Sequence, residues 1–204
     1  MDVERFKPDS TASRNPVVLF VGRLVEKKGC EYLIRAMARV QEAIPNAELV
    51  VIGDGPLRSN LEQLAQRSLR WYEFLGVQPV DRVRSWMNRA RVLSVPSVTA
   101  SSGDAEGFGL VFAEAQAMGL PVVSFATGGV SEAVAHGETG YLAAERDWEG
   151  LARYIQALLT ENALWHRFSV AGQERVRALF DLEKQTSKLE EHYQKVLSEK
   201  GTCG

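Results

Sequence analysis

Apolar residues occur along this chain in two alternating patterns. Short, mostly apolar runs at 17–21, 47–52, 71–75 and 92–95 are rich in β-branched and aromatic residues, and each is followed by a glycine or a proline. Runs of this length that end at such residues are typical of buried strands. Two further runs, at 121–124 and 141–142, continue the series, so the pattern predicts six strands.

Between these runs, apolar residues recur at helical spacing. The clearest case is residues 29–44, where the apolar positions fall on one face and Pro45 follows. The same reasoning predicts helices at 57–67, at 81–89 with Asp81 as its cap, between Gly109 and Gly119, and at 130–135. From residue 147 onward the pattern is helical throughout, in three helices broken near 160 and 181.

Strands that alternate with helices of this length predict a doubly wound, Rossmann-like α/β fold, with a parallel sheet and helices on both faces. In such sheets, ligands bind beyond the carboxyl ends of the strands. The charged or glycine-rich loops of this chain follow strands, with Arg23 and Lys28 after the first and residues 97–106 after the fourth. We therefore expect one functional edge of the sheet.

Composition sets the remaining limits. The chain has 204 residues, 45% of them hydrophobic, and a net charge of −2, which is ordinary for a globular protein and gives no electrostatic reason to expect nucleic acid. Cys30 and Cys203 form neither a disulfide framework nor a metal-binding spacing, so a reducing cytoplasm is the expected location. We predict a linker or N-terminal extension at 1–16, one domain at 17–198 and a flexible tail at 199–204.

The stretch from Glu106 to Val123 carries the strongest functional signal. Gly107 and Gly109 leave the backbone bare where a helix begins, and the free N–H groups at a helix start suit an anion. Glu106 and Glu114 are unsuited to phosphate, so we interpret them as acceptors for the hydroxyl groups of a sugar or ribose. Because seven residues separate them, one must lie in the loop and the other in the helix. A phosphate flanked by two sugars describes a nucleotide sugar.

Two basic residues after the first predicted strand could complete such a site. Arg23 and Lys28 could neutralise a diphosphate, Arg through its two-pronged guanidinium and Lys as a point charge. A solvated basic loop would have the same sequence, and Lys27 fits that ordinary interpretation better. On spacing alone the two interpretations are equally good.

The turn at residues 53–56 resembles a dinucleotide-binding fingerprint only superficially. Its third glycine is missing, since Ser59 and Asn60 stand there, and it follows the second strand instead of the first. A tight turn that lets a nucleotide pass near Gly53 is the better interpretation, and a purely structural turn is almost as good.

Other reactive residues give weak signals. His136, His166 and His192 have no catalytic or metal-binding spacing, so we expect no metal site and no role for them in chemistry. Asp104 is a minor candidate, and Trp165 and Phe168 are expected in the core.

Taken together, these motifs resemble the C-terminal, nucleotide-sugar-binding domain of the family 4 retaining glycosyltransferases, whose GT-B fold has two facing Rossmann-like domains. The resemblance runs from Val17 to about Val196. Its pieces are Val21-Gly22-Arg23-Leu24 with Lys28-Gly29, Gly53-Asp54-Gly55-Pro56, Phe74-Leu75-Gly76, Pro96-Ser97, the two glutamates with seven residues between them, Thr127-Gly128-Gly129-Val130-Ser131-Glu132, and Gly137-Glu138-Thr139-Gly140.

The resemblance implies a role for each site residue. Arg23 and Lys28 would bind the diphosphate and stabilise it as a leaving group, Glu106 would meet the donor sugar, and Glu114 the ribose. The remaining donor contacts would come from Gly22, Gly53, Val77, Phe108, Gly109 and Leu110, with Val77 along the base and the amides of residues 108–110 at the sugar and distal phosphate. The donor would be a UDP-, GDP- or ADP-sugar, with retention of configuration and with no metal or other cofactor.

The resemblance also implies a partner. Members of the family hold the acceptor in a second, N-terminal domain, and the opening of this chain looks like the stretch after the interdomain crossing. We expect an excised or truncated domain that binds donor and turns over little alone, with membrane association only in the full-length enzyme. The alternatives are a GT-B epimerase acting on the nucleotide sugar, a non-catalytic nucleotide-sugar-binding module and, last, a nicotinamide-dependent dehydrogenase.

Overall fold

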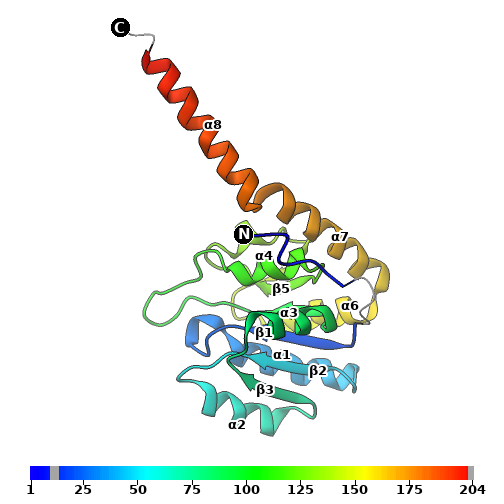
Figure 1. Cartoon of the computed structure of the whole chain (residues 1–204). Coiled ribbons are helices and arrows are strands. Elements are labelled where there is room, and N and C mark those ends of the chain that lie inside the picture. The colour runs from blue at the N-terminus through cyan, green and yellow to red at the C-terminus, as the bar shows by residue number, and fades with distance from the viewer. Residues whose placement is uncertain (10–13, 202–204) are drawn as a thin grey trace.

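The computed structural model describes residues 1–9 and 14–201 and contains a parallel sheet with helices on both faces (Figure 1). The six strands lie in the order β3-β2-β1-β4-β5-β6, and every neighbouring pair is parallel. The predicted doubly wound α/β fold is therefore confirmed. The strands are β1 (Val17–Val21), β2 (Glu48–Ile52), β3 (Tyr72–Gly76), β4 (Val92–Ser94), β5 (Val122–Phe125) and β6 (Gly140–Ala143).

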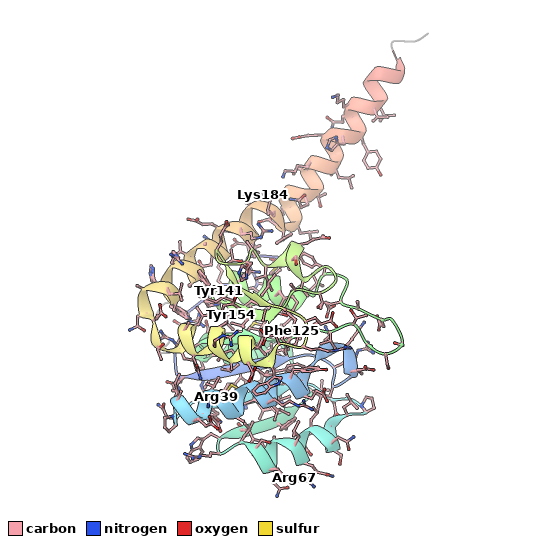
Figure 2. All side chains as sticks on the ribbon, turned by 180° about the vertical axis from the view of Figure 1, so that it is seen from behind. Arg39, Arg67, Phe125, Tyr141, Tyr154 and Lys184 are labelled. Carbon is pink, nitrogen blue, oxygen red and sulfur yellow. The ribbon has the colours of Figure 1, made fainter. Side chains whose placement is uncertain are left out.

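Two groups of helices cover the two faces of the sheet. Helix α1 packs against α2 and α6, and Figure 2 shows these three helices together on the face turned to the viewer. Helix α4 packs against α5 and α7 on the opposite face. The helices are α1 (Cys30–Ala43), α2 (Arg58–Ser68), α3 (Val80–Arg89), α4 (Leu110–Ala117), α5 (Val130–Ala133), α6 (Trp148–Thr160), α7 (Asn162–Leu179) and α8 (Leu182–Gly201), preceded by a short 3-10 helix, η1 (Glu26–Lys28).

The sheet changes winding direction between β1 and β4. From β1 the chain steps outward to β2 and then β3, whereas from β4 it steps the other way to β5 and β6. Right-handed crossovers in opposite directions place their helices on opposite faces. A crevice opens at such a switch point, beyond the carboxyl ends of the two central strands, and ligands of doubly wound sheets bind there. Both β1 and β4 are buried, as their apolar runs predict.

One predicted helix cap is wrong. Helix α3 begins at Val80 with Pro79 as its N-cap, so Asp81 already lies in the first turn and pairs with Arg84 on the surface at 3.3 Å. Proline fixes its own φ, here −64°, and it lacks the N–H that a strand would use. The chain therefore enters the helix one residue earlier than the aspartate suggests.

The two ends of the chain meet beside the end of α7. The Met1 amino group donates to the Phe180 carbonyl at 2.6 Å, the Leu182 N–H donates to the Met1 carbonyl at 3.0 Å, and Phe6 is buried in the core. Beyond this junction α8 projects away from the sheet, and its side chains from Leu182 to Leu197 are exposed (Figure 1). Residues 10–13 of the predicted linker and 202–204 of the predicted tail lie outside the described residues.

None of the helices in residues 1–9 and 14–201 combines the length and the apolar character that crossing a bilayer requires.

Candidate functional site

Lys28 and Glu106 meet at the switch point of the sheet. Lys28 ends η1, directly after β1, and Glu106 lies in the loop between β4 and α4. Their side chains form an ion pair and are only 14% and 11% exposed, and the Ser97 hydroxyl donates to the same Glu106 oxygen at 3.5 Å. Two residues that are 78 positions apart in the sequence thus come together because β1 and β4 are neighbours.

A glycine fixes the approach of η1 to β4. Gly29, which ends η1, has a φ of +61°, and a Cβ placed there would lie 1.9 Å from the Pro96 carbonyl oxygen. Only glycine therefore allows η1 to lie this close to the exit of β4. The close approach carries Lys28 to the loop that holds Glu106.

The loop that carries Glu106 rests directly on the turn after β5. The Gly129 N–H donates to the Glu106 carbonyl at 2.9 Å, and a Cβ on Gly129 would lie 1.6 Å from the Gly107 carbonyl oxygen. The Thr127 hydroxyl also donates to the Ser97 carbonyl at 2.6 Å. Backbone-to-backbone packing of this kind leaves the loop little freedom to move without the turn.

The start of α4 has the bare backbone that the sequence predicts. Gly109 is its N-cap, with a φ of +75° and no side-chain cap. None of the described residues accepts a hydrogen bond from the N–H groups of Phe108, Gly109 or Leu110, and the Leu110 side chain is 62% exposed. Free N–H groups and the positive end of the helix dipole therefore face the same open edge.

Glu106 and Glu114 occupy the two positions that their spacing requires, Glu106 in the loop and Glu114 within α4. Glu114 is half-buried, and burial raises the pKa of its carboxyl group, while the charge of Arg5 partly offsets this rise. Arg5, from the N-terminal segment, is thus an electrostatic partner of the α4 carboxylate that sequence analysis did not anticipate.

Arg23 is exposed, and no described residue forms a hydrogen bond or an ion pair with its guanidinium group. Its position at the end of β1 leaves this positive charge available to an incoming anion. Lys28, by contrast, must give up Glu106 to bind one.

At the same edge of the sheet, backbone hydrogen bonds connect the carboxyl ends of β1, β2 and β3. The Gly22 N–H donates to the Ile52 carbonyl at 3.0 Å, and the Gly53 N–H donates to the Gly76 carbonyl at 2.8 Å. A Cβ on Gly53 would lie 1.9 Å from the Gly22 carbonyl oxygen. The contact between the loops after β1 and β2 is therefore enough to explain a glycine at this position, without a ligand. Val77, just beyond, is 77% exposed. Contact of Gly22, Gly53 and Val77 with a nucleotide stays a prediction.

Polar contacts that sequence analysis missed hold the β4–α4 loop from outside. Glu26 accepts hydrogen bonds from the Ser101 N–H at 2.9 Å and from its hydroxyl at 2.8 Å, and Lys27 pairs with Asp104 at 2.9 Å. These bonds hold the pKa of the Glu26 carboxyl group below its usual range. Glu26 and Lys27 are visible in the sequence as charged residues beside Lys28, but the sequence does not identify Ser101 and Asp104 as their partners.

His136 has a structural role. Its Nδ1 accepts a hydrogen bond from the Leu142 N–H at 2.9 Å, and its ring packs edge-on against Tyr141 and Tyr154. Within the part of the chain that the structure describes, no three His, Cys, Asp or Glu side chains lie together as metal ligands would. His136 is exposed, and the expectation that it takes no part in chemistry stays a prediction.

Comparison with known proteins identifies the family. The family model for glycosyl transferases group 1 matches residues 2–175. The chain belongs to this family. Membership of a transferase family and the GT-B interpretation of the sequence are thereby confirmed, and the chain is consistent with the C-terminal domain of a GT-B glycosyltransferase.

Two curated relatives of this chain are named as glycosyltransferases. It is 31% identical to the GDP-mannose-dependent alpha-(1-6)-phosphatidylinositol monomannoside mannosyltransferase of Mycobacterium tuberculosis, covering 93% of this chain and 52% of that protein. It is 36% identical to the lipopolysaccharide core biosynthesis glycosyltransferase LpsE of Rhizobium meliloti, covering 89% and 50%. The chain therefore spans about half the length of these curated relatives.

Solved structures share its fold. Sucrose-phosphate synthase from Thermosynechococcus elongatus superposes with a TM-score of 0.83 at 31% identity, covering 97% of this chain and 51% of that one. Anabaena HepE, solved in complex with UDP and glucose, gives a TM-score of 0.82 at 24% identity, covering 96% and 55%. The Rossmann-like fold of this chain is thus shared with both solved structures.

Proposed function

We propose that this chain is the donor-binding domain of a retaining, metal-independent, family 4 glycosyltransferase that transfers a hexosyl group from a nucleoside-diphosphate sugar. The observation that carries the proposal is the meeting of Lys28 and Glu106 beside the bare start of α4, in a member of the glycosyl transferases group 1 family. A cation, an anion-binding helix start and a hydroxyl acceptor then lie at one edge of the sheet.

The diphosphate would bind between Arg23, Lys28 and the start of α4. The free guanidinium group of Arg23 and the Lys28 ammonium group offer charge-assisted hydrogen bonds, and the amides of residues 108–110, which have no acceptor among the described residues, would donate to phosphate oxygens. As the bond to the sugar breaks, negative charge grows on the diphosphate. Preorganised positive groups stabilise that charge and so accelerate the departure of the leaving group.

Glu106 would exchange one partner for another when the donor binds. In the free protein its carboxylate is paired with Lys28. A diphosphate competes for Lys28 and leaves the Glu106 oxygens to accept hydrogen bonds from sugar hydroxyls. Glu114, one helix turn or more into α4, would accept the ribose hydroxyls. The acceptor would then attack on the face from which the diphosphate leaves, which retains the anomeric configuration.

Charge balance supports metal independence. Two basic side chains and the positive end of α4 supply the positive charge that a bound cation contributes in other transferases. We propose no cofactor beyond the donor itself, and we propose a cytoplasmic location because the two cysteines form no disulfide framework.

The base and the acceptor are left to experiment. One relative is named for GDP-mannose and HepE was solved with UDP, so both purine and pyrimidine donors occur among related proteins. We propose that a second, N-terminal domain holds the acceptor, as the half-length match to the relatives suggests. Peripheral membrane association would belong to that two-domain protein.

A thermal-shift screen tests the donor site. The chain is melted with UDP, GDP, ADP, TDP and NAD in the presence of EDTA, and we expect one nucleoside diphosphate to raise the melting temperature while NAD does not. A ligand at roughly 100 times its Kd stabilises by about 2.7 kcal/mol, which is readily measured. Stabilisation by NAD alone would favour a dehydrogenase and contradict the proposal. If none of the compounds stabilises this chain, and none stabilises a two-domain protein that contains it, the proposal is wrong.

Replacing Glu114 by alanine should separate ribose from phosphate recognition. We expect the affinity for the stabilising nucleoside diphosphate to fall by about 1–2 kcal/mol, the size of one or two lost hydrogen bonds. The affinity for inorganic pyrophosphate should stay within about twofold of wild type, because Glu114 would not touch the diphosphate. Isothermal titration measures both, and Glu174→Ala, an exposed acid on α7, is the control. An equal loss for both ligands would rule out the ribose assignment.

A further inference from the structure

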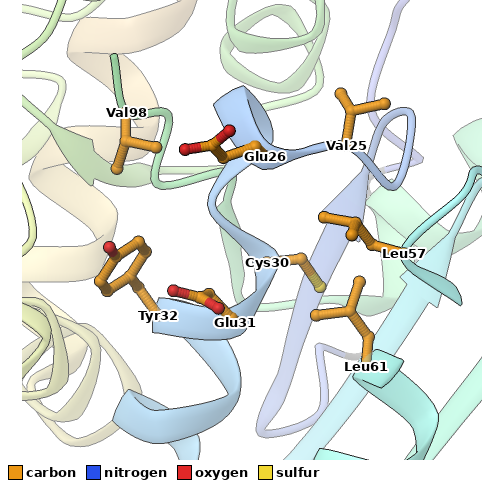
Figure 3. A pocket seen from close by; sticks show the side chains of 8 residues that line it. All are labelled: Val25, Glu26, Cys30, Glu31, Tyr32, Leu57, Leu61 and Val98. Carbon is orange, nitrogen blue, oxygen red and sulfur yellow. The ribbon is translucent and has the colours of Figure 1, made fainter. Parts of the chain in front are cut away.

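A second concave site lies on the other side of η1. A cavity of about 320 Å³ opens between the starts of α1 and α2 and the exits of β1 and β4 (Figure 3). We call it the α1–α2 cavity. Its volume is sufficient for a small organic molecule. None of the residues assigned above to the donor site lines it. The lining residues are Val25, Glu26, Cys30, Glu31, Tyr32, Leu57, Leu61 and Val98.

The walls of the α1–α2 cavity differ in character. On one side the Cys30 sulfur and the side chains of Val25, Leu57 and Leu61 form an apolar wall (Figure 3). Cys30 and Leu61 are 3% and 4% exposed, so this wall belongs to the core. Burial raises the pKa of the Cys30 thiol, and the charge of Glu31 adds to the rise, so this sulfur stays a neutral apolar group.

The other side of the cavity carries negative charge. The carboxylates of Glu26 and Glu31 and the ring of Tyr32 lie there, at the solvent-exposed mouth (Figure 3). Glu26 is held by the Ser101 hydroxyl and N–H and is influenced by the charge of Arg146. No described residue forms an ion pair or a hydrogen bond with the Glu31 carboxylate. Among the described residues, the Glu31 carboxylate therefore has no ion-pair partner, although Arg35 lies near the same mouth.

The aromatic ring at the mouth already attracts a cation. The guanidinium carbon of Arg35 lies 5.9 Å from the centroid of the Tyr32 ring, within the range of a cation–π interaction. The same ring borders the α1–α2 cavity beside Glu31. An aromatic face next to a carboxylate favours a positively charged group and disfavours an anion.

We propose that the α1–α2 cavity binds a small organic cation, an ammonium or guanidinium group carried on an apolar body. The charged end would lie at the mouth between Glu31 and Tyr32, with Glu26 adding to the negative potential. The apolar body would lie against Leu57, Leu61 and the neutral Cys30 sulfur. This site is separate from the proposed donor site, so its test does not depend on nucleotide binding.

Three probes with the same ring and different charge test the proposal on the full chain. Benzylammonium, benzyl alcohol and benzoate are titrated separately while amide chemical shifts are followed by NMR. We expect benzylammonium to bind at least about tenfold tighter than benzyl alcohol, and benzoate not to bind, because opposite charges attract across the mouth. The shifts should concentrate at residues 25–32 and 57–61. Equal affinity for the three probes, no binding, or shifts elsewhere would overturn the proposal.

A matched pair of variants tests the role of the unpaired carboxylate. Glu31→Gln removes one charge at the exposed first turn of α1 and should weaken benzylammonium binding by about fivefold. Glu149→Gln makes the same change in the exposed first turn of α6 and should leave it unchanged. Benzyl alcohol binding should be insensitive to both changes. Equal benzylammonium affinity in Glu31→Gln and wild type would contradict the assignment of the cation to the mouth.

Discussion

Lys28→Ala is expected to weaken binding of the stabilising nucleoside diphosphate by about 1–3 kcal/mol, roughly fivefold to 150-fold in Kd. Two effects add. The ammonium group no longer donates to a diphosphate oxygen, and the Glu106 carboxylate, only 11% exposed, loses its partner. An unpaired carboxylate at this position repels the incoming diphosphate. Isothermal titration in the presence of EDTA measures the loss.

Two further variants separate these effects. Lys28→Ala combined with Glu106→Gln removes the repelling charge, so the double variant should bind the nucleoside diphosphate more tightly than Lys28→Ala alone. Lys27→Ala is the matched control, because Lys27 pairs with the exposed Asp104 instead, and it should change the affinity by less than about threefold. If Lys27→Ala and Lys28→Ala have equal effects, the diphosphate lies elsewhere.

Gly129→Ala is expected to destabilise the protein by about 2–3 kcal/mol, since a clash between a Cβ and the backbone cannot be relieved by a rotamer change. The backbone φ of Gly129 is −81°, which any residue adopts, so the cost does not come from its conformation. It comes from the Gly107 carbonyl oxygen, 1.6 Å from the position of the added Cβ. Thermal unfolding should show a melting temperature lower by roughly 5–10 °C.

Gly107→Ala is the control for this prediction. A Cβ on Gly107 meets no atom within 4 Å, so the melting temperature should stay within about 2 °C of wild type. A lower melting temperature for Gly129→Ala and an unchanged one for Gly107→Ala would show that the packing of the loop on the turn causes the loss of stability. If Gly129→Ala melts like wild type, the loop and the turn are not held together as tightly as the structure implies.

Much of the fold could be predicted because its elements are locally encoded. The apolar run of β1 ends at Gly22, and the periodic positions of α1, such as Leu33 and Met37, face the core. Parallel strands buried on both faces give continuous apolar runs, which are easy to recognise. The prediction failed at the cap of α3, where Pro79 and Asp81 compete for the same role and only the backbone geometry decides between them.

The candidate site was predictable where it depends on strand order and not where it depends on loop packing. Lys28 and Glu106 lie at the ends of strands that become neighbours, so the topology alone brings them near each other. The contacts of Glu26 with Ser101 and of Gly129 with Gly107 depend on the path of a loop without periodicity. No local pattern encodes such a path, and these contacts became visible only in three dimensions.

The junction between β1 and β4 has a consequence for cooperativity. Residues 17–76 build one side of the sheet and residues 92–143 the other; within the sheet the two sides are joined at the pairs Val18 with Val92 and Leu19 with Leu93, and the packing of α1 against α6 joins them on one face. Arg23 and Lys28 belong to the first side, and the start of α4 belongs to the second. A ligand bound by both sides, as proposed for the donor, would act as a reversible cross-link and would add its binding free energy to the cost of unfolding either side locally.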